Sequence, residues 1–270
     1  MTTILKYLVF VIFVGGLFSA LISISVHKKN IVPQTNQAAN TTAIQPFAVV
    51  EIFTTEGCSN CPPAYKVVEK VLETANKYQL QVILLDFHVD YFNDPWVDPY
   101  SSPLYTERQE NYGKVFPKAG VFTPQMIVNG SEAMLASNSK MVHAAIDKAL
   151  NTMQVSRITI QDAKRDKDGY VKVHFTTENI PGDSMITIAL VQKKVVQKVP
   201  SGENAGATLT HHNVVRSLQL VKAKDEKVSI TLPSTSVSDS TVYQVIAFRQ
   251  TLPTMNITAA DQKEVSADAK

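Results

Sequence analysis

Two cysteines, the only ones in the chain, stand three positions apart at Cys58 and Cys61. An apolar run at residues 47–53 precedes them, and two prolines and a helical pattern of apolar residues follow. A thiol at the amino end of a helix meets unpaired N–H groups and the positive end of the helix dipole, which stabilise its thiolate. A thiolate is both the nucleophile and the leaving group in disulfide exchange. The pattern therefore predicts a catalytic dithiol, with Cys58 as nucleophile and Cys61 as resolving thiol.

Other interpretations of the two cysteines stay open. They could form an inert local disulfide, although a bridge that closes so short a loop stabilises a fold little. With no second cysteine pair, a zinc site would need distant ligands, so no dedicated metal site and no cofactor are predicted. The alternative functions are a copper-transfer module, in which His88 joins the two soft thiolate ligands, and a binding module without catalysis.

The elements that position the dithiol follow from the apolar pattern. Residues 47–53 and 81–87 are apolar enough to be buried strands, and the helix between them completes a βαβ unit. A further helix is expected at about residues 104–115. Residues 125–128 and 131–135 predict a hairpin, because Asn129-Gly130 is typical of a type I′ turn. A helix over residues 139–153 ends this region.

His88 and Asp90 follow directly after the second strand. The carboxyl ends of strands in an open α/β sheet line the usual ligand crevice, so both residues are expected on the dithiol side as supporting residues. They would handle protons or, in the simpler interpretation, anchor a loop. Trp96 belongs to an aromatic cluster with Tyr91 and Phe92, which would form either a peptide-binding surface or a small core.

Four segments carry a specific resemblance: VVEIFTTEGCSNCPP, HVDYFNDPWVDPYSSPLYTERQ, VFTPQMIVNG and GENAGATLTHHNVVR. They resemble the exported thioredoxin-like family called domain of unknown function 1223. The resemblance implies a thioredoxin-like fold, with Cys58 and Cys61 as the dithiol and Thr123-Pro124 as the cis-proline loop that binds partner peptides. The implied partners are protein thiols or disulfides. Gly57 stands where thioredoxin itself has tryptophan.

The periodicity changes after residue 153. Residues 154–255 contain several alternating segments separated by turn signals, which predicts a β-sandwich-like domain after the thioredoxin-like domain of residues 47–153. Residues 256–270 are polar and are expected to form a flexible tail. Within the second domain, Glu203-Asn204 and His211-His212 form a distinctive polar group. It could pack over the dithiol, and its adjacent histidines should point to opposite faces of a strand.

The composition and the first residues bear on location. With 26 Lys and Arg against 24 Asp and Glu, the chain lacks the basic excess that favours nucleic acid as a partner. Residues 1–26 contain a long apolar run and predict either a cleaved export signal or an uncleaved anchor, so residues 4–26 could form a membrane tether. Residues 27–46 are polar and predict a linker. The expected location is periplasmic or extracellular.

Overall fold

The computed structural model describes residues 44–168, 170–231 and 241–267. The signal or anchor of residues 1–26 and nearly all of the linker of residues 27–46 lie outside these ranges. The elements are β1 (Ala48–Thr54), α1 (Pro62–Tyr78), β2 (Val82–His88), α2 (Pro103–Val115), β3 (Gln125–Val128), β4 (Glu132–Leu135), α3 (Ser139–Leu150), β5 (Arg157–Arg165), β6 (Tyr170–Glu178), β7 (Met185–Lys198), β8 (Thr208–Lys222), β9 (Lys227–Thr231), β10 (Tyr243–Gln250), β11 (Ile257–Glu264) and β12 (Ser266–Ala267).

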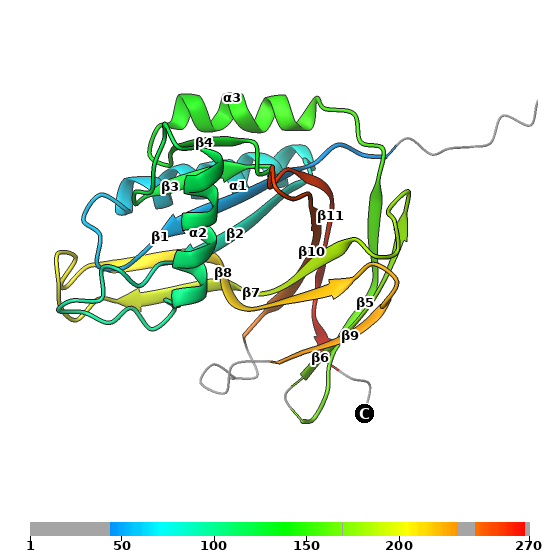
Figure 1. Ribbon diagram of the computed structural model, residues 1–270. Helices are drawn as coiled ribbons and strands as arrows, with labels where there is room; N and C mark the ends of the chain where they lie inside the picture. Colours follow the sequence, from blue (N-terminus) through cyan, green and yellow to red (C-terminus); the bar gives the residue numbers. More distant parts are fainter. Residues whose placement is uncertain (1–43, 169, 232–240, 268–270) are drawn as a thin grey trace, which may run out of the picture. The chain divides into compact units, whose positions relative to one another are not determined.

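A large mixed sheet runs through the described part of the chain, with strand order β11-β10-β7-β8-β2-β1-β3-β4. β1 and β2 are parallel, as a βαβ unit requires, and β3 lies antiparallel on the other side of β1. β8 pairs with β2 at the register Asp86↔Val214, so two segments far apart in the sequence lie side by side (Figure 1). The sheet is therefore continuous across the boundary that the sequence predicts at residue 153.

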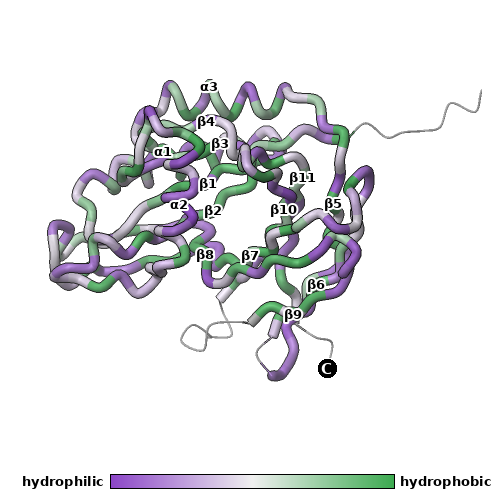
Figure 2. The backbone as a smooth tube through the Cα atoms, viewed as in Figure 1, coloured by the Kyte–Doolittle hydropathy of each residue, from purple (hydrophilic) through white to green (hydrophobic). Residues whose placement is uncertain are grey.

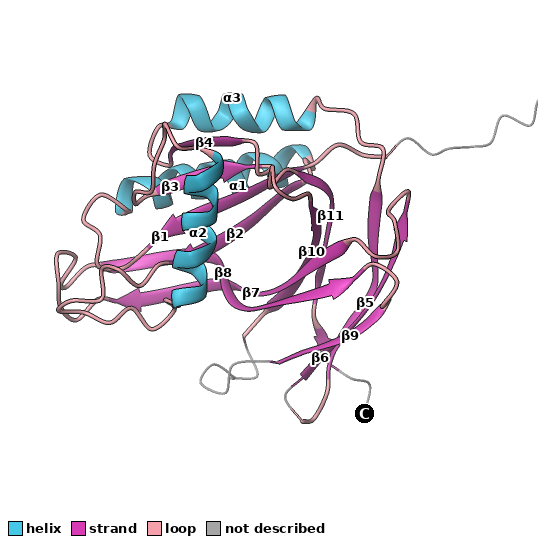
Figure 3. Ribbon diagram, viewed as in Figure 1, coloured by secondary structure: helices cyan, strands magenta, loops and turns pink. Residues whose placement is uncertain are grey.

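The helices cover both faces of the β1–β4 half of this sheet, whereas the rest is made of strands (Figure 3). α1 and α3 pack on one face through Val68, Ala75, Val142 and Ile146, among others. On the other face, Tyr112 of α2 joins a core with aromatic residues of β1, β2 and β10. β1 is buried along its whole length because both its faces and both its edges are covered. This burial explains why its sequence is a continuous apolar run.

The β3–β4 hairpin turns at Asn129 and Gly130, which both have positive φ, as the sequence predicts. Gly130 also meets a steric requirement. A Cβ placed there would lie 1.9 Å from the carbonyl oxygen of Met255, in the connection between β10 and β11. Only glycine allows this close approach.

A second sheet of four strands, in the order β12-β5-β6-β9, packs on β7, β8, β10 and β11. The core between them is built from alternating apolar residues, including Ile158, Phe175, Ile188 and Val245. The apolar stretches of β2, β7 and β8 stand out along the chain (Figure 2). The overall class is mixed α/β, with one large mixed sheet and few helices.

The end of the chain differs from the sequence prediction. Residues 257–264 were expected in a flexible tail but form β11, which pairs with β10 over its length. Their side chains are mostly polar because β11 is the edge strand of the large sheet and only Ile257 and Ala259 of the strand are buried in the core. In the ranges that the structure describes, no helix has the length and apolar character that a membrane crossing would need.

Candidate functional site

The two cysteines lie in the turn that leads from β1 into α1. Cys61 directly precedes α1, whose first two positions are Pro62 and Pro63, where a missing N–H costs nothing. The amide of Cys61 donates to the carbonyl of Cys58 at 3.1 Å, which closes the turn between them. Both cysteines are free thiols. Gly57 is needed before them, because a Cβ there would lie 2.8 Å from the carbonyl oxygen of Phe92.

The surroundings of the two thiols shift their pKa values in opposite directions. A hydrogen bond from the Cys61 thiol lowers the pKa of Cys58, and the backbone amides of Asn60 and Cys61 add to this effect against the opposing effect of burial. Burial raises the pKa of Cys61 well above its usual range, and the neighbouring Cys58 raises it further. Cys58 is thus the sulfur that ionises first, as expected for a nucleophile beside a protonated resolving thiol.

The Thr123-Pro124 loop faces the dithiol. Its peptide bond is cis, and the carbonyl oxygen of Thr123 lies 3.8 Å from Sγ of Cys58. Two contacts hold this loop in place. From α2, the side-chain amide of Gln109 donates to the carbonyl of Phe122 at 2.7 Å, and from the loop after β2, the hydroxyl of Tyr91 bonds that of Thr123. The structure therefore brings together the four residues that the sequence proposes as catalytic and substrate-binding.

Both thiols are buried in this conformation, although disulfide exchange requires that a partner disulfide reach the attacking sulfur. Cys58 is 2% exposed and Cys61 is fully buried, in a small core with Trp96, Val199 and Leu209. The covering residues come from the loop after β2 and from the connection between β7 and β8. We call Trp96 together with residues 199–207 the cover. The sequence suggested only that the Glu203-Asn204 group could pack over the dithiol and gave none of its contacts, because the cover residues at 199–207 lie far from the cysteines along the chain.

Polar contacts hold the cover on the cysteine loop. The side-chain amide of Asn204 donates to the carbonyls of Glu56 and Cys58, at 2.8 Å in both cases. Glu203 accepts from the amide of Ser59 at 3.0 Å in an exposed position. Trp96 donates its indole N–H to Glu56 at 2.8 Å. The segment around Glu203 and Asn204 thus packs over the dithiol, which is one of the roles considered for it from sequence.

A cluster of buried polar side chains lies beneath the cover. It consists of Glu56, Asp86, His88, Asp98 and His211, each no more than 2% exposed. Nδ1 of His88 lies 2.7 Å from Asp98, and Nε2 of His211 lies 3.2 Å from Glu56. Asp98 also accepts from the amide of Glu56 at 2.8 Å. We call these five residues the buried polar cluster.

The charge state of this cluster depends on its internal pairing. Burial opposes a charge on His88, but the carboxylates of Asp98 and Asp86 outweigh it and raise the pKa of His88 well above the usual value. Burial likewise opposes a charge on Asp98, but His88 and the amides of Glu56 and Tyr100 bring its pKa down to about 2. The pair is therefore a buried ion pair, which is stable only while both partners are present.

Of the three supporting residues predicted from sequence, His88 and Trp96 belong to the site and Asp90 does not. Asp90 accepts from the hydroxyl of Thr106 at 2.5 Å and so anchors the loop to α2. His88 contacts Tyr100 and His211 edge to face, away from the Tyr91 and Phe92 pair. Tyr91 and Phe92 remain exposed near the Thr123-Pro124 loop, so the aromatic cluster is divided between surface and interior.

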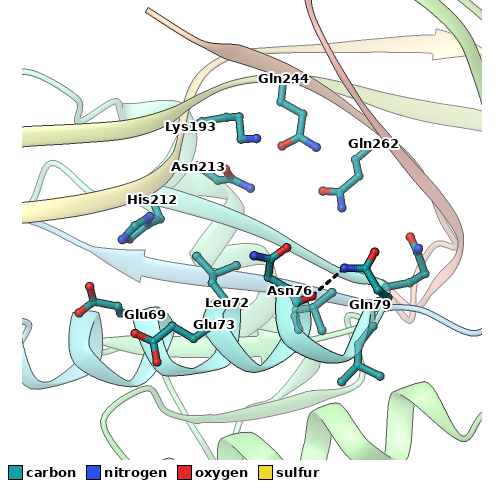
Figure 4. A pocket seen from close by; sticks show the side chains of 14 residues that line it. Glu69, Leu72, Glu73, Asn76, Gln79, Lys193, His212, Asn213, Gln244 and Gln262 are labelled. Atoms are coloured by element: carbon teal, nitrogen blue, oxygen red, sulfur yellow. Dashed lines mark hydrogen bonds between the residues drawn. The ribbon is translucent and has the colours of Figure 1, made fainter.

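Sequence reasoning did not identify Glu56, Asp86 and Asp98 as parts of the site. A signal for Asp86 existed. Leu84, Asp86 and His88 share one face of β2, and two polar residues on the inner face of an otherwise apolar strand indicate a specific role. His211 points into the cluster, while His212 points to the other side of β8 and toward Glu69 of α1 in an open pocket (Figure 4).

The ligand set of the copper alternative is not assembled here. Among the residues that the structure describes, the group whose ligand atoms all lie within 4.8 Å of one another is Asp86, His88 and His211. Neither sulfur belongs to it. His88 already uses one ring nitrogen for Asp98 and directs the other toward Asp86.

One solved structure shares the overall fold of this chain. A crystal structure of a protein from Agrobacterium tumefaciens has a TM-score of 0.58 and 21% identity, over 84% of this chain and 98% of that chain. A domain of the outer membrane lipoprotein Omp28 from Porphyromonas gingivalis, with 15% identity over 42% of this chain and 98% of that one, has a TM-score of 0.26, too low to support an argument. No curated protein matches the chain. The model of the family described as protein of unknown function DUF1223 matches residues 49–250, so the chain belongs to this family.

Proposed function

We propose that the protein is a thioredoxin-like thiol–disulfide exchange protein that acts on protein thiols through Cys58 and Cys61. The observation that carries the proposal is geometric: two free thiols lie at the start of α1, and Sγ of Cys58 lies 3.8 Å from the carbonyl oxygen of Thr123. The opposite directions in which the surroundings shift the two thiol pKa values support it. The order of elements from β1 to α3 and the cis peptide bond before Pro124 support the thioredoxin-like assignment. The apolar run within residues 4–26 supports work outside the cytoplasm, where disulfides persist.

The proposed exchange has two steps. The Cys58 thiolate attacks a partner disulfide, so that a mixed disulfide forms and one partner sulfur leaves as a thiolate. Cys61 then gives its proton to that thiolate and, as a thiolate itself, attacks Cys58. The Cys58–Cys61 disulfide forms, and the second partner sulfur leaves as a thiolate that takes a proton from water. The partner gains two electrons and the protein loses them. The same steps in reverse pass a disulfide to the partner.

Access to Cys58 requires the cover to move, because a partner disulfide has to reach a sulfur that is 2% exposed. The contacts of the cover suit such movement, since the Glu203 contact is exposed and Asn204 contributes neutral hydrogen bonds. Tyr91 and Phe92 lie at the surface next to the Thr123-Pro124 loop and would contact the partner peptide there. The proposed protein is thus a gated dithiol.

Replacing Asn204 with Ala should open the cover more often. The variant loses two hydrogen bonds to the cysteine loop, worth together roughly 1–3 kcal/mol, so alkylation of Cys58 by iodoacetamide should accelerate about tenfold. Gln197→Ala is the matched control, because Gln197 lies on the same hairpin and its side chain donates to the neighbouring carbonyl of Lys198 instead of to the cysteine loop. Equal rates in the wild type and both variants would show that these bonds do not limit access.

The pH profile of alkylation tests the proposed function itself. In the Asn204→Ala background, where access is less limiting, the rate at Cys58 should rise with pH and level off below the pH at which an ordinary thiol does so, because its pKa is lowered. Cys61, whose pKa is raised, should stay slow through the same range. Mass spectrometry of the two alkylated positions gives both profiles. Two slow, superimposable profiles would remove the basis for calling Cys58 the nucleophile.

A further inference from the structure

Among the residues that the structure describes, three of the buried side-chain atoms without a hydrogen-bond partner belong to neighbouring rings. They are Nε2 of His88, Nδ1 of His211 and the hydroxyl oxygen of Tyr65, each in a side chain that is almost completely buried. The Tyr65 ring contacts the His211 ring edge to face at 4.8 Å between centroids, and the His211 ring contacts that of His88 at 4.7 Å. A buried polar atom without a partner is costly, so three in one place point to a missing occupant.

Asp86 completes the arrangement. One of its carboxylate oxygens lies 3.4 Å from Nε2 of His88 and 4.0 Å from Nδ1 of His211, whereas its other oxygen accepts from the hydroxyl of Thr54 at 2.7 Å. The imidazole nitrogens of His88 and His211 that have no partner thus face the same carboxylate oxygen. Two imidazoles and one carboxylate form a donor set that divalent transition metals prefer.

The remaining two members of the buried polar cluster orient these donors. Asp98 is bonded to Nδ1 of His88, which directs Nε2 inward, and Glu56 is bonded to Nε2 of His211, which directs Nδ1 inward. Protein metal sites commonly show this arrangement, in which an outer carboxylate accepts from a ligating histidine and fixes its ring. His88 bonds its carboxylate partner through Nδ1, and His211 bonds its partner through Nε2. In each ring, the second nitrogen faces Asp86 and remains available as a ligand.

We propose that Asp86, His88 and His211 bind one divalent transition-metal ion, for which Zn²⁺ is the best match. The ion takes the place of the proton on Nε2 of His88, because histidine binds a metal as the neutral ring and metal binding releases protons. Tetrahedral coordination at about 2.0–2.1 Å places neighbouring ligand atoms roughly 3.3 Å apart, so the observed 3.4 Å is suitable and the 4.0 Å separation needs a small inward movement. The site would tie β2 to β8 beneath the cover. This inference goes beyond the proposed dithiol function and does not depend on it.

The site differs from the copper alternative in its ligands, and this difference makes it testable. Purified full-length protein, stripped with a chelator, should take up one equivalent of Zn²⁺ in competition with a chromophoric chelator. His211→Ala should weaken binding by more than about 100-fold, because it removes a ligand, and loss of an outer-shell partner alone already costs roughly 10–100-fold. His212→Ala should bind as the wild type does, because His212 lies on the same strand but points to the other side of β8. The double variant Cys58→Ser/Cys61→Ser should also retain binding.

Substitution with Co²⁺ gives a second test that does not depend on whether variants fold. The wild-type Co²⁺ spectrum should show nitrogen and oxygen coordination without a thiolate charge-transfer band. Such a band, together with loss of Zn²⁺ uptake in the double cysteine variant, would overturn the proposal and place the metal on the thiols. No uptake by the wild type would also overturn it and leave the cluster as a network of ion pairs and hydrogen bonds. The alkylation profile of Cys58 is measured on chelator-stripped protein, so the two proposals can fail separately.

Discussion

Replacing Cys61 with Ser should turn the protein into a trap that holds its partners as mixed disulfides. Cys58 keeps its position beside the Thr123 carbonyl and attacks a partner disulfide, but no thiol remains to resolve the product. Catalysed insulin reduction should fall to the uncatalysed rate, while covalent adducts accumulate. Non-reducing electrophoresis of full-length protein incubated with a disulfide-bonded peptide measures the adducts directly.

The matched variant is Cys58→Ser, which should lose both catalysis and adduct formation, because the remaining Cys61 is fully buried and its pKa is raised. In the Cys61→Ser variant, serine replaces the thiol that contributes most to lowering the pKa of Cys58. The Cys58 thiolate therefore loses part of its stabilisation. The serine hydroxyl can still donate to Cys58, so attack should persist. Adducts formed by Cys58→Ser and absent from Cys61→Ser would reverse the assigned roles.

Replacing Asp98 with Ala should destabilise the fold by about 3–5 kcal/mol, the scale on which losing one partner of a buried ion pair costs stability. The variant leaves His88 without its partner at 2.7 Å and removes the acceptor of the Glu56 and Tyr100 amides. All of these groups lie in the interior or close to it, where water cannot replace the lost acceptor. Urea unfolding of the full-length chain should show a lower midpoint with an unchanged slope.

Asp90→Ala is the matched control for Asp98→Ala. Asp90 lies in the same loop and also accepts a short hydrogen bond, but its partner Thr106 sits at the partly exposed start of α2. Its loss should cost no more than about 1 kcal/mol. If the two variants unfolded at the same urea concentration, the buried polar cluster would contribute little to stability.

Local patterns were sufficient to predict the first half of the fold. The apolar runs at β1 and β2, the helix after Pro62-Pro63 and the Asn129-Gly130 turn each depend on residues that are close in sequence. The spacing of Cys58 and Cys61 is also a local pattern, whereas the place of Thr123-Pro124 beside them was implied by the family resemblance. The burial of Cys58 could not be predicted in this way, because it depends on residues that are distant in sequence.

Long-range pairing was the part that the sequence did not reveal. β8 pairs with β7 on one side and β2 on the other, and this placement brings His211 against His88 and Asn204 against Glu56. Single-sequence patterns report which face of a strand is apolar, but not which strand lies beside it. β11 was missed because an edge strand needs few apolar residues. The two histidines were correctly expected to point to opposite faces, but the partners of His211 could not be deduced.

The pairing of β8 with β2 limits how the protein can be divided. A fragment ending after α3 would keep both cysteines and the cis-proline loop, yet β2 would become a bare edge inviting association with other chains. It would also lack His211 of the buried polar cluster and residues 199–207 of the cover, including Asn204. We expect such a fragment to aggregate, and we expect its uncovered thiols to react with any accessible disulfide. The strand-rich second half of the chain would therefore make the two thiols of the first half selective for their partners.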